Sequence, residues 1–244
     1  MEIQRVHRME AAQARGVVIV IDVIRAFSVA AYALAGGARA LWLVRAVEDA
    51  LALRQREPEA LLAGEVGGRL IPGFDFNNSP SQMAQARIQG RLLIQRTGAG
   101  TQGAVGAINA THLLPCSLVN ARATAAYARQ LATSTDGLIT LMPTETRGSE
   151  GVQPMEDQLC ADYLEALLTG QADPPAVLAA GIARLRASGR FAIFESGSSD
   201  FPVEDIAAFL AADRFHFAMI GVREQWNQIA YIHVQRVGIS PMES

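Results

Sequence analysis

The chain has 244 residues, of which 50% are hydrophobic, and its 21 basic and 24 acidic residues leave a net charge of −3. This composition supports a sizeable core, and it offers neither a basic patch for nucleic acid nor an apolar run long enough to cross a membrane. All 21 basic residues are arginine, which excludes Schiff-base chemistry, pyridoxal attachment and a P-loop lysine.

The N-terminal sequence and the cysteines favour a cytoplasmic protein. Residues 1–15 are charged and lack the apolar stretch of a secretion signal. Cys116 and Cys160 are not spaced as metal ligands, which fits a reducing compartment.

The first half of the chain predicts alternating strands and helices. The apolar run VVIVI makes Gly16–Ile21 a buried strand, and Ala26–Ala35 follows as a helix that ends at a glycine pair. Gly64–Ser79 is rich in Gly, Pro and Asn and is predicted to be a loop, after which Ser79-Pro80 begins a helix. The remaining predictions are strands at Ala38–Val44, Ala60–Ala63 and Arg91–Gln95 and a helix at Val47–Arg56.

The second half continues with helices and closes with two strands. Helices are predicted at Leu118–Leu131, Glu156–Leu168, Pro175–Ala187 and Val203–Ala212, and a strand at Gly137–Met142. Phe215–Gly221 and Gln228–Val237 alternate like strands and could pair antiparallel. The alternation predicts an α/β protein with helices on both faces of a mixed, largely parallel sheet. No repeat or linker divides the chain, so we expect a single domain over residues 1–244.

Three predicted strands end in side chains that suit a magnesium site. Asp22, Glu65 and Thr97 each follow a strand, and ligands of open α/β sheets bind beyond the carboxyl ends of the strands. If these strands are parallel neighbours, the three groups converge, and hard oxygen ligands suit Mg²⁺. Arg25 lies one helical turn after Asp22 and could reach an anion there. The alternative is that Asp22 only caps the following helix.

Two glycine-containing or polar loops could also contact a ligand. The loop GFDFNNSPSQ places polar oxygens beside a helix N-terminus, which favours a bound anion; these residues are Asp75, Asn77, Asn78 and Ser79. In RTGAGTQGA, Thr97 and Thr101 flank turns that allow close approach of the backbone, although this is neither a P-loop nor a dinucleotide fingerprint. An ordinary turn and a packing turn are the respective alternatives.

Two further patterns have strong structural alternatives. Cys116 and Arg122 have the C-x5-R spacing of cysteine-dependent phosphatases, but the intervening SLVNA has no glycine to form a phosphate cradle. Glu156 and Asp157 stand at a helix start, where acidic residues commonly complement the helix dipole. Cys160, inside the same predicted helix, is expected to be a small buried hydrophobe.

Six stretches between about Val17 and Met219 resemble the 2-phosphosulfolactate phosphatase (ComB-like) family, and they occur in the family's order. They are DVIRAFSVAAYALAGGA, GEVGGRLIPGFDFNNSP, RTGAGTQG, SLVNARATA, PMEDQLCADYL and EDIAAFLAADRFHFAM. The resemblance implies a three-layer α/β/α fold. It also implies Mg²⁺-dependent hydrolysis of 2-phosphosulfolactate to sulfolactate and phosphate, in the coenzyme M pathway.

The resemblance implies roles for the positions that match the family's motifs. Asp22 and Arg25 become the catalytic pair. The implied metal ligands are Asp22, Glu65, Asp75, Glu156 and Asp157. The implied substrate-binding residues are Asn78, Ser79, Arg96, Thr97, Gly100, Thr101 and Asn120. The expected partner is a small phosphorylated anion whose sulfonate and carboxylate would be met by further arginines, Arg69 and Arg96. A homo-oligomer is an open alternative.

Departures from the family pattern leave the substrate and the nucleophile open. Many members have an asparagine where this chain has Ala99, a glutamate near Gln82, and a glycine where this chain has Asn77. The alternatives are therefore a phosphatase of another small phosphorylated hydroxy acid, or an inactive homologue that binds small anions. The attacking group is either a metal-activated water or an aspartate, and the DxDx[TV] signature of aspartyl phosphatases is absent after Asp22.

Overall fold

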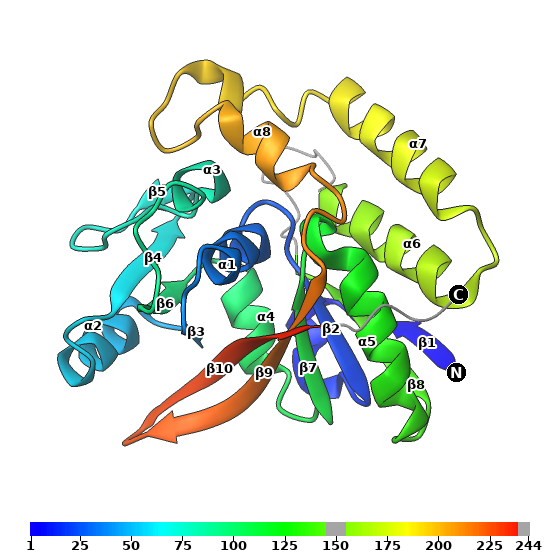
Figure 1. Ribbon diagram of the computed structural model, residues 1–244, viewed down its shortest axis with the longest axis horizontal. Coiled ribbons are helices and arrows are strands. Elements are labelled where there is room, and N and C mark those ends of the chain that lie inside the picture. The colour runs from blue at the N-terminus through cyan, green and yellow to red at the C-terminus, as the bar shows by residue number, and fades with distance from the viewer. Residues whose placement is uncertain (145–154, 239–244) are drawn as a thin grey trace.

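The computed structural model describes residues 1–144 and 155–238, and within them ten strands form one sheet (Figure 1). The strands are β1 (Glu2–Arg5), β2 (Val17–Ile21), β3 (Ala40–Val44), β4 (Leu61–Val66), β5 (Arg69–Leu70), β6 (Leu92–Arg96), β7 (His112–Cys116), β8 (Leu138–Pro143), β9 (Phe217–Trp226) and β10 (Ile229–Gly238). The α-helices are α1 (Ala26–Ala35), α2 (Val47–Arg56), α3 (Pro80–Met83), α4 (Gly100–Gly106), α5 (Ala121–Thr133), α6 (Glu156–Thr169), α7 (Pro174–Ala187) and α8 (Glu204–Phe209). The 3-10 helices are η1 (Arg8–Gln13), η2 (Leu118–Asn120) and η3 (Phe194–Ser196). None of these described helices has the length and apolar character needed to span a bilayer.

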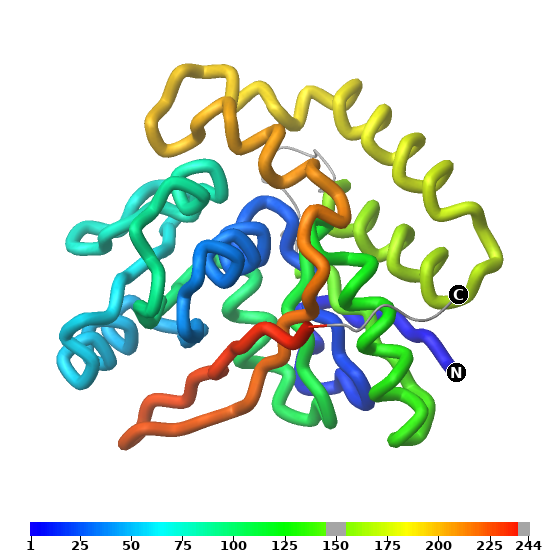
Figure 2. Tube along the Cα trace, in the orientation of Figure 1, coloured from blue at the N-terminus to red at the C-terminus, as the bar shows by residue number. Residues whose placement is uncertain are grey.

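Two groups of parallel strands are joined by an antiparallel hairpin, in the order β1-β8-β2-β7-β9-β10-β3-β6-β4-β5. Strands β1, β8, β2 and β7 pair in parallel, and so do β3, β6 and β4. The hairpin strands β9 and β10 pair antiparallel with each other and with their neighbours β7 and β3. Figure 2 shows this hairpin reaching from the centre of the molecule to a protruding tip. The predicted antiparallel pair at the end of the chain is thereby confirmed.

Helices cover both faces of the first parallel group, as the unbroken apolar run of β2 predicts. Val18 and Val20 pack in one core with α1 and α4, whereas Ile19 and Ile21 pack in a second core with α5 and α6. A third core lies between α2 and the second parallel group. The predicted fold class, a three-layer α/β/α arrangement around a mixed, largely parallel sheet, is confirmed.

The central strand β7 is absent from the sequence-based prediction. Its sequence HLLPC contains Pro115, and proline argues against a central strand because it has no N–H to donate. In the structure β7 pairs along its whole length with β2, but its ladder with β9 is limited to Leu113. Pro115 therefore lies outside the ladder with β9, and its missing N–H interrupts no bond there.

Asp22, Glu65 and Thr97 were expected to converge if their three strands were parallel neighbours. The structure corrects this condition, because the three strands are not all neighbours. β4 and β6 are adjacent and parallel, but β2 belongs to the other parallel group. Their carboxyl ends nevertheless come together, because the sheet twists and because α1 and α4, which follow β2 and β6, pack against each other. Figure 1 shows these ends lying beneath α8 and the segment that precedes it.

Candidate active site

A pocket of about 440 Å³ opens at the carboxyl ends of β2, β4 and β6. Three of its walls are the turns that follow these strands. The fourth is the segment that follows α7 and runs into the first turn of α8, residues 190–205, which we call the roof segment; Asn78 of the loop before α3 completes the lining. The lining residues are Asp22, Ile24, Arg25, Glu65, Gly67, Gly68, Asn78, Thr97, Gly98, Ala99, Arg190, Ile193, Phe194 and Phe201. The pocket thus brings together five of the predicted site residues, namely Asp22, Arg25, Glu65, Asn78 and Thr97.

Asp22 presents a buried carboxylate at the end of β2. Its side chain is only 4% exposed, and its Oδ1 accepts a hydrogen bond of 3.0 Å from the N–H of Ala26 in the first turn of α1. Burial is the main cause that raises the pKa of Asp22 to about 6, and the negative charges of Glu65 and Glu156 add to it. The N–H groups of Ala26 and Gly100 act in the opposite direction. Asp22 therefore accepts the first N–H of α1, although the N-cap residue is Arg25, and also lines the pocket.

The start of α4 lies very close to this carboxylate because residue 100 is a glycine. A Cβ added at Gly100 would lie 2.6 Å from Oδ2 of Asp22 and 2.8 Å from Cβ of Ala26. No larger residue fits without displacing one of them. Gly100 does not line the pocket itself, but it sets how closely the β6–α4 turn approaches Asp22.

Glu65 connects two of the pocket walls. Its Oε2 accepts a bond of 2.7 Å from the N–H of Gly68 in the β4–β5 turn, and its Oε1 accepts one of 2.5 Å from the N–H of Gly98 in the β6–α4 turn. Both carboxylate oxygens are thus oriented by the backbone, which leaves their remaining lone pairs available for a ligand.

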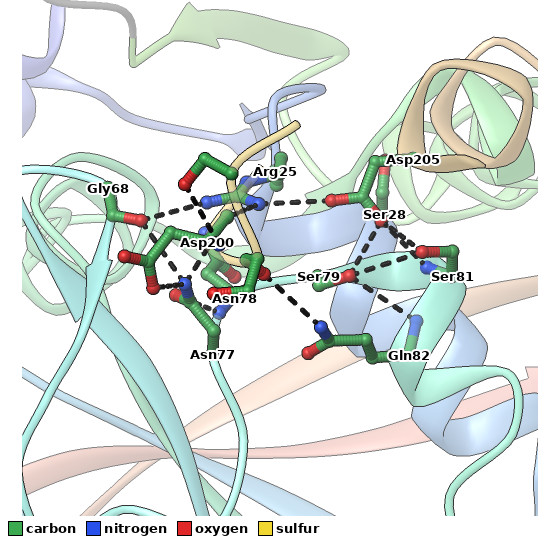
Figure 3. Close-up of polar contacts among 12 residues, drawn as sticks. Arg25, Ser28, Gly68, Asn77, Asn78, Ser79, Ser81, Gln82, Asp200 and Asp205 are labelled. Atoms are coloured by element: carbon green, nitrogen blue, oxygen red, sulfur yellow. Dashed lines mark hydrogen bonds and ion pairs between the residues drawn. The ribbon is translucent and has the colours of Figure 1, made fainter. Parts of the chain in front are cut away.

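Arg25 crosses the pocket wall under the roof segment (Figure 3). Its side chain is 3% exposed, and its Nη1 donates to Oδ2 of Asp205 at 3.0 Å and to the carbonyl oxygen of Asp200 at 2.7 Å. Nη2 donates to the carbonyl oxygen of Gly68 at 3.2 Å. The guanidinium carbon lies 4.8 Å from the ring centre of Phe201 and 5.6 Å from that of Phe194. Burial lowers the pKa of Arg25, and the hydrogen bond and charge of Asp205 oppose this.

Both arginines of the pocket are paired with carboxylates. Arg25 pairs with Asp205, and Nη2 of Arg190 lies 2.6 Å from Oε1 of Glu156. Neither ion pair involves the carboxylates of Asp22 or Glu65. The lining residues alone carry two carboxylates and two guanidiniums, but with Asp205 and Glu156 counted, four acidic groups meet two basic ones among these described residues, which favours a cation.

Three predicted substrate-binding residues support the pocket walls without lining the pocket. Ser79 caps α3 and donates to Asp205 at 2.7 Å. Arg96 donates to the carbonyl oxygens of Arg45 and Glu65. Thr101 exchanges hydrogen bonds with Thr97 across the start of α4.

Four other predicted residues do not line the pocket and are held by structural partners, in part close to it. Asp75 accepts from the N–H of Leu62 and pairs with Arg54 at 3.1 Å. Asp157 accepts from the N–H groups of Val23 and Thr144, and Asn120 holds Ser117 and Thr124 at the start of α5. Glu156 is the buried partner of Arg190. The five predicted metal ligands do not form one site, since residues 1–144 and 155–238 contain no group of three or more metal-type side chains placed to hold an ion.

The C-x5-R spacing does not form a phosphate site. Cys116 is fully buried with its Sγ 3.4 Å from the carbonyl oxygen of Ser117, and Arg122 pairs with Asp213. Neither residue lines the pocket. Cys160 is fully buried, as expected of a small hydrophobe.

The sequence analysis missed the roof segment. Arg190, Phe194, Phe201 and Asp205 are far along the chain from the strand ends, and no spacing connects them with Asp22. The stretch EDIAAFL, which contains Asp205, contributed to the resemblance, but it suggested only a helix start.

The chain matches the model of one protein family, described as 2-phosphosulpholactate phosphatase, over residues 3–188. A probable 2-phosphosulfolactate phosphatase of Bacillus subtilis is 40% identical over 152 residues, which is 62% of this chain and 64% of the relative. The protein of the same name from Thermus thermophilus is 38% identical over 161 residues, 65% of each chain. The chain thus spans slightly less than two thirds of the length of these two relatives. The matched family region includes every pocket wall except the roof segment. The chain belongs to the 2-phosphosulpholactate phosphatase family.

Proposed function

We propose that the chain is a magnesium-dependent phosphatase that hydrolyses 2-phosphosulfolactate to sulfolactate and phosphate. The observation that carries this proposal is the charge of the pocket. Asp22 and Glu65 face a space whose two arginines are already paired, so a phosphate ester would be repelled unless a cation joined it. The family to which the chain belongs and the names of its relatives support the same activity.

The donor set suits Mg²⁺ in particular. Mg²⁺ binds through one or two carboxylates and fills its other positions with water and substrate phosphate. Asp22 and Glu65 are two such carboxylates, lining one pocket and oriented by backbone N–H groups. When bound there, Mg²⁺ would neutralise phosphoryl charge and lower the pKa of a bound water.

The side chains of the pocket divide the remaining work. Arg25 would donate hydrogen bonds that orient the phosphoryl group, while Asn78 and Thr97 offer an amide and a hydroxyl. Hydrolysis consumes one water, whose oxygen bonds to phosphorus as the ester P–O bond breaks and the leaving oxygen takes a proton. Preorganised charge of this kind is the main source of rate enhancement in phosphoryl transfer.

A second substrate is kept as a candidate because Ala99 lines the pocket. This is the position where many family members have an asparagine, so a contact with the substrate differs here. Of the arginines expected to meet the sulfonate and carboxylate, Arg96 is held by backbone carbonyls and Arg69 is exposed on β5. Another small phosphorylated hydroxy acid is therefore the alternative substrate.

The test is phosphate release from racemic 2-phosphosulfolactate, with phospholactate and phosphoglycerate in parallel, in Mg²⁺ and in EDTA. We expect turnover that needs the metal and that falls by at least about 100-fold in Asp22→Ala. Asp75→Asn is the matched control, because Asp75 lies outside the pocket, and it should keep its turnover. Turnover that survives EDTA would contradict the metal. Absence of turnover on all three esters would leave the homologue that binds anions without catalysis.

A further inference from the structure

Within the roof segment, the buried carboxylate of Asp205 joins Arg25 to the start of α3. We infer that Asp205 is a positioning residue, which fixes the guanidinium of Arg25 at the pocket and so sets the orientation of the phosphate that Arg25 meets. This inference rests on the proposed function, and it assigns a role to a residue outside the family-matched region 3–188.

Asp205 is completely buried, with 0% of its side chain exposed, and both of its oxygens are used. Oδ2 accepts from Nη1 of Arg25 at 3.0 Å. Oδ1 accepts from the hydroxyl of Ser79 at 2.7 Å, and from the hydroxyl and N–H of Ser81 at 2.6 and 3.0 Å (Figure 3). A buried carboxylate is tolerated only when its bonds are satisfied in this way. The serines fix one oxygen, so the position of the other is fixed as well.

Hydrogen bonds and two aromatic rings restrain the guanidinium of Arg25. Asp205 and the carbonyl of Asp200 hold Nη1, and the carbonyl of Gly68 holds one hydrogen of Nη2. The rings of Phe194 and Phe201 lie near the guanidinium. Within the described chain, the Nε hydrogen and the second Nη2 hydrogen have no such bond, and Arg25 lines the pocket. The Nε and Nη2 edge of a guanidinium is the edge whose fork matches two phosphate oxygens.

Asp205 is the partner that sets this geometry, because it is the only charged acceptor among the hydrogen bonds described for Arg25. Charge-assisted bonds are about twice as strong as neutral ones. An arginine that is held before the phosphate arrives loses less freedom on binding it. Asp205 would therefore act through Arg25, without touching the substrate.

The test is a double-mutant cycle between Asp205→Asn and Arg25→Gln, read as kcat/KM for phosphate release. In Asp205→Asn, Oδ1 can still accept from the serines, but an amide NH₂ replaces the oxygen that faced Nη1, so two donors meet. With Arg25 unchanged, we expect Asp205→Asn to lower kcat/KM by about 100-fold. We expect less than about a threefold further fall when Arg25→Gln is already present, since coupled residues are not additive.

Ser81→Ala is the matched control. It removes one of the three bonds to Oδ1 but keeps those from the Ser79 hydroxyl and the N–H of residue 81, so the carboxylate stays in place beside Arg25 and we expect less than about a threefold loss of kcat/KM. If Asp205→Asn loses as much activity with Arg25→Gln as without it, Asp205 acts only on stability and the inference is overturned. If Asp205→Asn does not fold, Asp205→Glu enters the same cycle. It keeps the charge but moves the carboxylate, so full activity would overturn the positioning role.

A second readout separates this inference from the proposed function. If the wild-type protein hydrolyses none of the three esters, the proposed function fails, and the cycle is repeated on the dissociation constant of inorganic phosphate in Mg²⁺, measured by calorimetry. Weaker phosphate binding in Asp205→Asn that disappears in the Arg25→Gln background would support the positioning role. If Asp205→Asn weakens phosphate binding by the same factor in both backgrounds, the positioning role is overturned. The same holds if the wild-type protein binds no phosphate.

Discussion

At the scale of the residue, Asp22 combines a structural bond with an unbalanced charge. Its carboxylate accepts the N–H of Ala26 in α1 while lying in a pocket that also contains Glu65. Burial and neighbouring negative charge raise its pKa from 3.8 to about 6. The folded protein therefore binds this proton more tightly than the unfolded chain does, and ionisation of Asp22 destabilises the fold.

This raised pKa predicts how stability changes with pH. In the absence of metal, Asp22 lowers the free energy of unfolding as the pH rises through the window from 3.8 to about 6, by a total on the order of 3 kcal/mol. The wild-type free energy of unfolding minus that of Asp22→Asn should fall by this amount across the window, measured by urea denaturation in EDTA. The control is Glu59→Gln at an exposed residue, which should not show this change with pH. A difference that stays constant with pH would refute the assignment.

At the scale of the element, the β6–α4 turn decides how closely the second parallel group approaches β2. The turn is held by Glu65 through the N–H of Gly98 and by the reciprocal bonds of Thr97 and Thr101. Gly100 begins α4 directly against Asp22. The turn is therefore shaped by contacts with another strand end, more than by the helical preference of its own residues.

Gly100→Ala separates these two influences. Alanine favours a helix over glycine by about 1 kcal/mol, but its Cβ would meet Asp22 and Ala26 well inside contact distance. Overpacking of this kind costs about 1–3 kcal/mol, so we expect a net loss of stability together with at least about a tenfold loss of turnover. Thermal denaturation and phosphate release measure the two effects.

Gly106→Ala provides the comparison at the other end of α4. Its Cβ would meet the flexible end of Arg45 at 3.0 Å and Ala11 at 3.1 Å, away from the pocket. Turnover should therefore be retained even if some stability is lost. If Gly100→Ala is as stable and active as the wild-type protein, the close approach of α4 to Asp22 has no functional weight.

At the scale of the whole molecule, the pocket lies where the two parallel groups of strands come together. The two parallel groups are connected in the sheet by the hairpin β9–β10, and the pocket takes Asp22 from one group and Glu65 from the other. In Figure 1 the roof segment lies above the carboxyl ends of strands from both groups. A ligand that binds both carboxylates would therefore link the two groups directly.

Binding of Mg²⁺ should consequently stabilise the entire fold. A ligand at about 100 times its dissociation constant adds about 2.7 kcal/mol, which for a chain of this size raises the melting temperature by roughly 5–10 °C. We expect this rise in the wild-type protein by scanning calorimetry, and its loss in Glu65→Gln. Asp75→Asn should keep it, because Asp75 pairs with Arg54 outside the pocket. A rise that is equal in all three proteins would place the ion elsewhere.

Local sequence patterns predicted the parts of this protein that local physics decides. A short unbroken run of β-branched residues favours a strand buried on both faces, and β2 is one. The proline and serine at the start of α3 act as expected, and the closing hairpin follows from alternation. Asp22, Glu65 and Thr97 were predicted at strand ends and do line one pocket.

The tertiary structure alone decided which distant segments complete that pocket. The central strand β7 was not predicted, and its Pro115 is accommodated because the ladder with β9 is limited to Leu113. The pairing of Arg25 with Asp205 joins positions 180 residues apart. A sequence pattern records the preferences of neighbouring residues, whereas such contacts depend on how twisted strands and packed helices bring remote segments together, and no local preference specifies that geometry.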